Sequence, residues 1–291
     1  MKRIRIVGLC LVAAFALSAT IASSSQAAGY YHCVAQKKGE YTNSTCTTKS
    51  VKAKKGKYEL AEFASCVAQK KGEYTNNTCT TKSVKAKKGK YEKVAPITFT
   101  DKTGEAKLAT PDLGPHDVEC TASTSSGDIT GSTTGTDQVE FTGCTLEGHS
   151  CESADLFGYG TNSGKAGVID TDPLDTTLVG HGEKAGGYEH KEPASGEVWG
   201  EVVGTTSGYS SEFICNGEII LHTHGSVSGV STPVNGAPST SGTNTFGLGE
   251  GEQALLTEVF NGTEFIPSGG APSTEETTAT LTYSAPIVVK S

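Results

Sequence analysis

The segment Thr280-Leu281-Thr282-Tyr283 alternates a small hydroxyl residue with a large apolar or aromatic one. Successive side chains on a β-strand point to opposite faces, so this pattern predicts a strand with one buried face and one wet face. Val139-Glu140-Phe141 repeats the pattern. Short β-prone runs of this kind are separated by clusters of Gly, Pro, Ser and Asn, and they are Ile97–Thr100, Val118–Ala122, Gln138–Thr142, Val168–Thr171, Glu197–Val203, Glu212–Cys215, Glu218–His222, Thr278–Tyr283 and Ile287–Lys290.

The composition agrees with a β fold. From residue 101 onward there are 28 Thr and 20 Ser, and the whole chain of 291 residues holds 36 Gly. Thr is β-branched, and Ser and Gly favour turns, so a helical bundle, a coiled coil and a multi-span membrane protein are excluded. About nine to fourteen short strands predict an all-β fold for residues 96–291, namely one β-sandwich or jelly-roll-like domain. Within it, Val230–Thr245 is expected to be a long loop, because it is rich in Ser, Thr, Gly and Pro.

The N-terminal segment Met1–Ala28 has the features of a secretory signal peptide. Three basic residues precede the apolar stretch Ile6–Ala22, and Ser25-Gln26-Ala27 is a small-x-small cleavage site. An uncleaved membrane anchor is the alternative, since the apolar stretch nearly spans a bilayer. We therefore expect a secreted or cell-surface protein.

Charge divides the rest of the chain into two parts. Residues 29–95 carry 15 Lys and 5 Glu, a net charge of +10, whereas residues 96–291 carry 6 Lys and 27 acidic residues, a net charge of −21. Every Arg lies in the first 28 residues. Because Arg is the usual bidentate reader of bases and phosphates, specific nucleic-acid recognition is not expected, while Lys-based attraction to a diffuse anionic surface stays open.

The basic part contains two tandem repeats. Cys33–Glu59 and Cys66–Glu92 differ only at Ser44, which corresponds to Asn77. Each copy contains two units of the form Val-x-x-Lys-Lys-Gly-x-Tyr, which predict short hairpins with Val and Tyr inward and Lys in solvent. Such a small core needs a covalent constraint.

The equal spacing of the repeat cysteines favours the disulfides Cys33–Cys46 and Cys66–Cys79. Zinc is disfavoured because the spacing is not that of a zinc knuckle and His32 is the one histidine nearby.

Exposed Lys beside Tyr predicts contact with an anionic polymer or glycan, in which Tyr stacks on sugar faces. Two alternatives stay open. The lysines form a solvated face while Tyr fills the small core, or the basic part docks on the acidic part of the same chain.

Four cysteines remain in the acidic part. We expect Cys144 to pair with Cys151 across the turn Thr145–Ser150, and Cys120 to pair with Cys215. Four cysteines allow three connectivities, and the other two stay open.

Two polar motifs of the acidic part suggest chemistry. His222-Thr223-His224 places two imidazoles on one face of a strand, as in a β-sheet metal site, and His181, His190 and Glu218 are candidates to join them. Asp170–Asp175 has the carboxylate density that calcium prefers, but Pro173 interrupts it and the glycine and terminal Glu of an EF-hand loop are missing. Exposed histidines and an ordinary acidic turn are the plainer readings, so no metal, cofactor or catalytic residue is assigned.

The chain resembles uncharacterised secreted proteins of actinobacteria. The resemblance rests on Cys-x12-Cys-Thr followed by Gly-x-Tyr-Glu in each repeat, and on Phe141-Thr142-Gly143-Cys144, Glu212-Phe213-Ile214-Cys215 and Gly225-Ser226-Val227. It implies export and a β-rich body stapled by disulfides, and it carries no activity or catalytic residue.

Together these observations predict an exported, non-enzymatic binding or structural module of the cell envelope or extracellular space. Two alternatives remain. One is a secreted hydrolase that uses His222 and His224, and the other is a structural surface protein whose basic and acidic parts dock together.

Overall fold

The computed structural model describes residues 28–85, 87–110, 117–180, 198–205, 208–247 and 253–291, apart from the side chain of Trp199. These residues form strands and connecting turns without a helix. The predicted signal peptide, except Ala28, lies outside the described residues. The strands are β1 Gly29–Gly39, β2 Gly56–Glu62, β3 Cys66–Gly72, β4 Gly89–Lys93, β5 Ile97–Thr103, β6 Ala106–Ala109, β7 Val118–Cys120, β8 Ala122–Ile129, β9 Thr134–Asp137, β10 Val139–Thr142, β11 Thr145–Leu146, β12 His149–Ser153, β13 Val168–Asp170, β14 Leu174–Gly180, β15 Val198–Gly204, β16 Tyr209–Cys215, β17 Ile219–Thr232, β18 Ser239–Phe246, β19 Ala254–Phe260 and β20 Phe265–Lys290.

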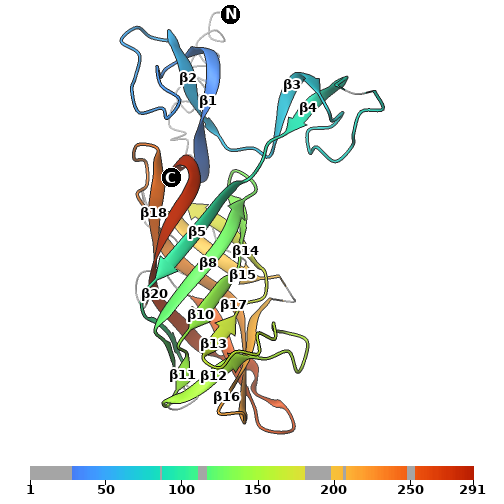
Figure 1. The fold of residues 1–291 in the computed structure, drawn as a ribbon, viewed down its shortest axis with the longest axis vertical. Helices are drawn as coiled ribbons and strands as arrows, with labels where there is room; N and C mark the ends of the chain where they lie inside the picture. Colours follow the sequence, from blue (N-terminus) through green and yellow to red (C-terminus); the bar gives the residue numbers. More distant parts are fainter. Residues whose placement is uncertain (1–27, 86, 111–116, 181–197, 206–207, 248–252) are drawn as a thin grey trace, which may run out of the picture.

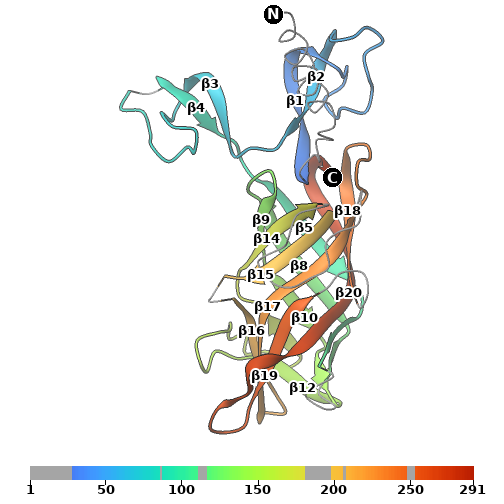
Figure 2. The same ribbon diagram turned by 180° about the vertical axis from the view of Figure 1, so that it is seen from behind.

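The body is one antiparallel sheet that closes on itself at two levels. At the level nearer the N-terminal hairpins, the pairs run in the order β5, β8, β9, β14, β15, β17, β18, β20 and back to β5. At the other level they run β6, β7, β11, β12, β16, β17, β19, β20 and back to β6. The long strands β17 and β20 belong to both levels, which makes the body elongated (Figures 1 and 2).

The predicted all-β class is confirmed, and so are the disulfide-stapled hairpins ahead of the body. The structure differs from the predicted sandwich in how its layers are connected. The facing layers belong to a single sheet that is continuous around its perimeter, because β17 and β20 each find partners along both edges. Closure of this kind leaves few unpaired strand edges in the body.

The prediction of a long loop at Val230–Thr245 is wrong. Its two ends are strand, and only the six residues between β17 and β18 connect them. Val230 pairs with Thr245 and Thr232 with Thr243, and β18 pairs on its other side with β20. Thr residues fit a pleated sheet well, and here their β propensity outweighs the turn tendency of the neighbouring Gly and Ser.

Two apolar clusters fill the two ends of the closed sheet. The cluster at the hairpin end contains Ala28, Phe63, Ile97, Phe99, Ile129, Leu178, Val198, Leu281, Ile287 and Val289. The cluster at the far end contains Ala106, Val118, Cys120, Cys144, Leu146, Cys151, Ile169, Phe213, Cys215 and Leu221. The interior between them has a more polar lining, which is described below.

Each 27-residue repeat forms one hairpin rather than two. β1 pairs with β2, and β3 pairs with β4 as a separate two-stranded sheet. Both hairpins project from one end of the body (Figures 1 and 2). The first is continuous with the body, since Gly29–His32 of β1 also pairs with Ile287–Lys290 of β20.

The cysteine pairing differs from the prediction in the body. Cys151 lies directly opposite Cys215 in the β12–β16 pair. The registers of β11 with β7 and β12 place Cys144 opposite both Cys120 and Cys151, so the four cysteines form one row across four strands. Disulfides join Cys120 to Cys144 and Cys151 to Cys215, with Cα–Cα distances of 3.9 and 4.0 Å.

The predicted pairs Cys120–Cys215 and Cys144–Cys151 are therefore wrong. Cys120 and Cys215 are three strands apart, which is about 14 Å at the usual strand spacing. A disulfide joins residues whose Cα atoms lie within about 7 Å. A bond between the two central cysteines would leave the two outer ones without partners.

Candidate functional site

Three local features stabilise the lysine hairpins, residues 33–59 and 66–93. The disulfides Cys33–Cys46 and Cys66–Cys79 close each loop, as the spacing predicts. In the first hairpin the Asn43 side chain accepts the backbone N–H groups of Thr47 and Thr48 and so fixes the loop. Asn76 does the same in the second hairpin.

The third feature is the close packing of glycine backbone against tyrosine backbone. An ideal Cβ on Gly39 would lie 2.0 Å from the Tyr58 carbonyl oxygen, and one on Gly56 would lie 2.2 Å from that of Tyr41. The two Lys-Lys-Gly-x-Tyr units of a repeat thus pack on each other reciprocally, each glycine against the tyrosine of the other unit. Only glycine fits at these positions.

The hairpin lysines are all exposed, and none has an ion-pair partner among the described residues. They are Lys37, Lys38, Lys49, Lys52, Lys54, Lys55, Lys57, Lys70, Lys71, Lys82, Lys85, Lys87, Lys88, Lys90 and Lys93. The predicted solvent position of Lys therefore agrees with the structure. The result is a strongly cationic surface at one end of a chain whose body is acidic.

The aromatic and apolar residues of the hairpins follow the prediction only in part. Tyr41 and Tyr58 are half-buried, and so are Tyr74 and Tyr91, so each ring keeps an accessible edge or face. The predicted inward position is wrong for Val51 and Val84, which are 102% and 103% exposed. They lie in the long loop of each hairpin, where no second layer covers them.

The predicted histidines lie in a polar row on the outer face of the far end of the body. His222 of β17 is directly opposite Glu212 of β16 and Glu258 of β19. Nε2 of His222 lies 3.3 Å from Oε2 of Glu212, and Nε2 of His224 lies 3.9 Å from Oε1 of Glu258. Glu218 is exposed in the turn before β17, and His181 and His190 lie outside the described residues.

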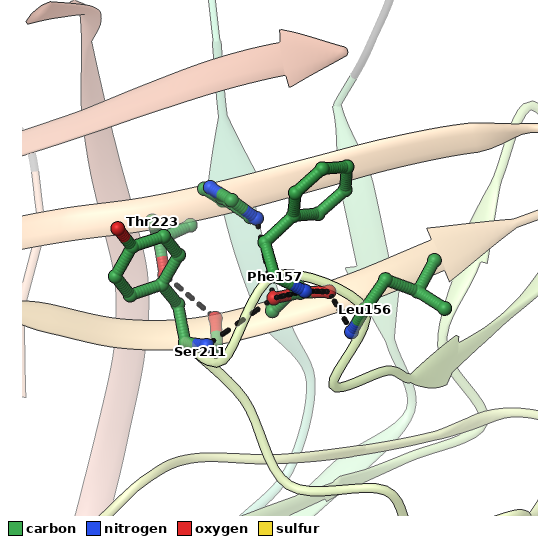
Figure 3. Close-up of polar contacts among 7 residues, drawn as sticks. Leu156, Phe157, Ser211 and Thr223 are labelled. Carbon is green, nitrogen blue, oxygen red and sulfur yellow. Dashed lines mark hydrogen bonds and ion pairs between the residues drawn. The ribbon is translucent and has the colours of Figure 1, made fainter. Parts of the chain in front are cut away.

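Glu212 anchors the segment after β12. Its carboxylate is fully buried and accepts the backbone N–H groups of Leu156, Phe157 and Tyr159 at 2.5 to 3.3 Å (Figure 3). On the neighbouring positions of the strands, Ser211 and Thr223 share a hydrogen bond of 2.6 Å. A carboxylate that accepts several N–H groups is stable as an anion even when it is buried.

Aromatic rings enclose His222. Phe265 stacks on it with a centroid distance of 3.8 Å, and the edges of Phe157, Tyr159 and Tyr209 surround it at 5.2 to 5.6 Å. Burial lowers the pKa of His222, against the opposite effect of the Glu212 and Glu258 charges, and burial also lowers the pKa of His224. Burial therefore favours the neutral form of both imidazoles.

The histidine row, which consists of Glu212, His222, His224 and Glu258, supports the loops that cover it. The His222 side chain is 1% exposed, so a substrate does not reach it, whereas the His224 side chain is 19% exposed. Among the described residues, no group of three or more His, Cys, Asp and Glu side chains is placed to hold a metal ion.

The acidic motif Asp170–Asp175 is not gathered around one point. Asp170 ends β13 opposite Glu140, and Asp172 is buried, with a carboxylate that accepts from the Thr161 hydroxyl at 3.1 Å. Asp175 is exposed in β14. Burial first, then the Glu140 charge, raise the pKa of Asp170.

Glu212 and Glu258 were missed by the sequence reasoning. Each lies on a strand next to β17, directly opposite His222, and that relation depends on register. No local pattern marks the role of Glu212, which directly precedes the apolar residues Phe213-Ile214-Cys215.

The four disulfides indicate an oxidising, extracytoplasmic environment. The part of the chain that the structure describes holds no helix able to cross a lipid bilayer. No protein-family model, curated protein or solved structure matches the chain. The resemblance to secreted actinobacterial proteins therefore stays a prediction.

Proposed function

We propose that this protein is exported and acts as a non-enzymatic binding module of the cell envelope or extracellular space. In this proposal the lysine hairpins engage an anionic wall polymer or glycan. The observation that carries it is the set of fifteen exposed hairpin lysines, none of which has an ion-pair partner among the described residues. Unpaired lysines on projecting hairpins leave their charge available to an external anion.

The charge distribution supports an oriented contact. The body carries a net charge of −21 and repels an anionic polymer, whereas the hairpin part carries +10 at one end of the molecule. A polyanion is thus attracted to the hairpin end and repelled elsewhere. The half-buried tyrosines beside the lysines offer ring faces on which a sugar can stack.

The alternative in which the basic and acidic parts dock together has less support. No ion pair joins a hairpin lysine to the body within the described residues. The second hairpin pairs with no strand of the body. Both hairpins project from one end of the body (Figure 2).

The test is retention of the whole secreted chain on purified Gram-positive cell wall, before and after its anionic polymers are stripped. We expect strong retention at about 50 mM salt, a steep fall by about 500 mM, and little retention on stripped wall, because the attraction is screened. Loss of two lysines in each hairpin loop (Lys52, Lys55, Lys85 and Lys88, each changed to Gln) should lower retention several-fold.

The matched control is the double change of Lys102 and Lys165 to Gln, which removes exposed lysines of the body. It should leave retention unchanged. Absence of retention at low salt, or equal losses in the hairpin and body variants, would contradict the proposal.

A further inference from the structure

The interior of the closed sheet holds a cavity of about 140 Å³ between the two apolar clusters. Its lining combines hydroxyl groups, such as those of Thr103 and Thr277, with the rings of Phe99, Phe246 and Tyr283. An interior space of this size is known to hold one small organic molecule the size of a benzene ring. Neither the histidine row nor the lysine hairpins use it.

Three carboxyl groups from distant parts of the sequence meet at this cavity. Asp101 lies on β5, Asp137 on β9 and Glu275 on β20, and all three line the space. Ser125 donates a hydrogen bond of 2.7 Å to Oδ2 of Asp101, but the buried Oδ1 of Asp101 has no hydrogen-bond partner among the described residues.

Glu275 is the most exceptional of the three. It lines the cavity and is half-buried. Its backbone exchanges two hydrogen bonds with the Gln253 side chain, whereas its carboxyl group makes none with the described residues. A buried acceptor without a donor costs free energy, so the carboxyl group is available to a donor that enters the cavity.

The described lining holds no cation that neutralises these groups. Lys107 lines the space, but its Nζ lies 2.7 Å from Oδ2 of Asp117 and is more than a third exposed. The other titratable groups that face the cavity are Tyr30, Tyr283 and Glu201. The described part of the lining therefore holds acidic groups, ionised or protonated, and no cation paired with them.

We infer that this cavity is a binding site for a small organic cation, a primary ammonium with a short alkyl chain. An ammonium group has three N–H donors, and it can donate to the unpartnered Oδ1 of Asp101 and to the carboxyl group of Glu275 or Asp137. The alkyl chain would lie against the rings of Phe99 and Tyr283. A metal ion fits less well, since the three carboxyl groups do not converge as a metal site.

A second hollow adjoins the cavity at the wall of the sheet. It is shallow and more open to solvent, and it shares Phe99 and Asp137 with the cavity. Asp137 thus lies between the two spaces. Its carboxylate would attract a cation toward the interior.

Burial and the mutual repulsion of the acids raise the pKa of Glu275 to about 7, and mainly burial raises that of Asp137 to about 6. The carboxyl groups are thus partly protonated at neutral pH. Binding of a cation favours their ionised form, so affinity should rise with pH and binding should release protons.

The experiment is calorimetric titration of the whole chain with n-butylammonium chloride in an amine-free buffer, with n-butanol as the uncharged probe of the same shape. We expect n-butylammonium to bind at least about tenfold more tightly at pH 8 than at pH 5, with proton release at pH 7, and n-butanol to bind far more weakly. Equal binding of both probes, or no binding of n-butylammonium at pH 8, would overturn the inference.

Variants locate the site. Glu275→Gln should weaken n-butylammonium binding at least about tenfold, since it removes a charge at the cavity. The control is Glu276→Gln, the next residue of β20, which does not line the cavity. Asp101→Asn serves as a second cavity variant, and near-UV circular dichroism verifies that each variant is folded. Equal effects of the Glu275 and Glu276 changes would place binding outside the cavity and contradict the inference.

Discussion

At the scale of single residues, Gly72 has no space for a side chain. An ideal Cβ there would lie 2.0 Å from the carbonyl oxygen of Tyr91. Gly72→Ala should therefore open the second hairpin and leave the body folded, because that hairpin forms a sheet of its own. Trypsin should cut after the lysines of residues 66–93 at least about tenfold faster, as expected when local opening exposes the backbone.

Gly104→Ala is the matched control, since an added Cβ at Gly104 meets nothing within 4 Å. Its digestion pattern should equal that of the unchanged chain. If Gly72→Ala also leaves the pattern unchanged, the backbone approach does not hold the hairpin together.

Glu212 is the second residue whose role can be measured. Its buried carboxylate accepts three backbone N–H groups of the segment 156–159. Glu212→Gln removes the charge and one acceptor oxygen, and it should lower the free energy of unfolding by about 1.5–3 kcal/mol. Urea unfolding measures the loss, with Glu218→Gln in the exposed turn as the control. A loss as large in the control would refute this role.

These two residues show why sequence reasoning works unevenly at this scale. The repeated Lys-Lys-Gly-x-Tyr unit makes its glycine conspicuous, although the tyrosine backbone that it touches belongs to the other unit. Glu212 belongs to no repeat, and the string Glu212-Phe213-Ile214-Cys215 does not indicate its structural role. Its role depends on a loop that returns over β16, and such long-range contacts have no local signal.

At the scale of strands, the β-prone runs were predictable, while their registers were not. Each of the nine predicted runs overlaps a strand, because alternation and β-branched residues are local properties. The cysteine pairs of the body failed because they depend on which strands are neighbours. The pairs within each hairpin succeeded because both cysteines belong to one short repeat.

The row of four cysteines gives a prediction at this scale. Peptide mapping of the unreduced chain should recover Cys120 linked to Cys144 and Cys151 linked to Cys215. Replacing either pair by alanine should lower the free energy of unfolding by about 3–4 kcal/mol on the loop-entropy account. Recovery of Cys144 linked to Cys151 would contradict this pairing.

At the scale of the whole molecule, the interior acids make stability depend on pH. Burial raises the pKa of Glu275 from 4.5 to about 7, so its protonated form fits the fold better. Its contribution is complete below about pH 4.5 and is lost as pH rises through 7. Without an added amine, the urea midpoint should be higher at pH 5 than at pH 8. The corresponding difference in the free energy of unfolding is up to about 3 kcal/mol.

Glu275→Gln should flatten this pH dependence, because glutamine stays neutral throughout. The exposed Glu119→Gln is the control and should keep the slope. A urea midpoint that rises from pH 5 to pH 8 in the unchanged chain would show that other titratable groups dominate the pH dependence of stability.

The pairing of Gly29–His32 with Ile287–Lys290 joins the first and the last strand that the structure describes. A ribosome makes the first of these segments long before the second, so β1 waits for its partner until β20 has been made. The hairpins are local and can form early, but the closed sheet cannot be completed in order of synthesis. A truncation that removes only the last few residues should therefore leave the first strand without its partner and the body unsealed at the hairpin end.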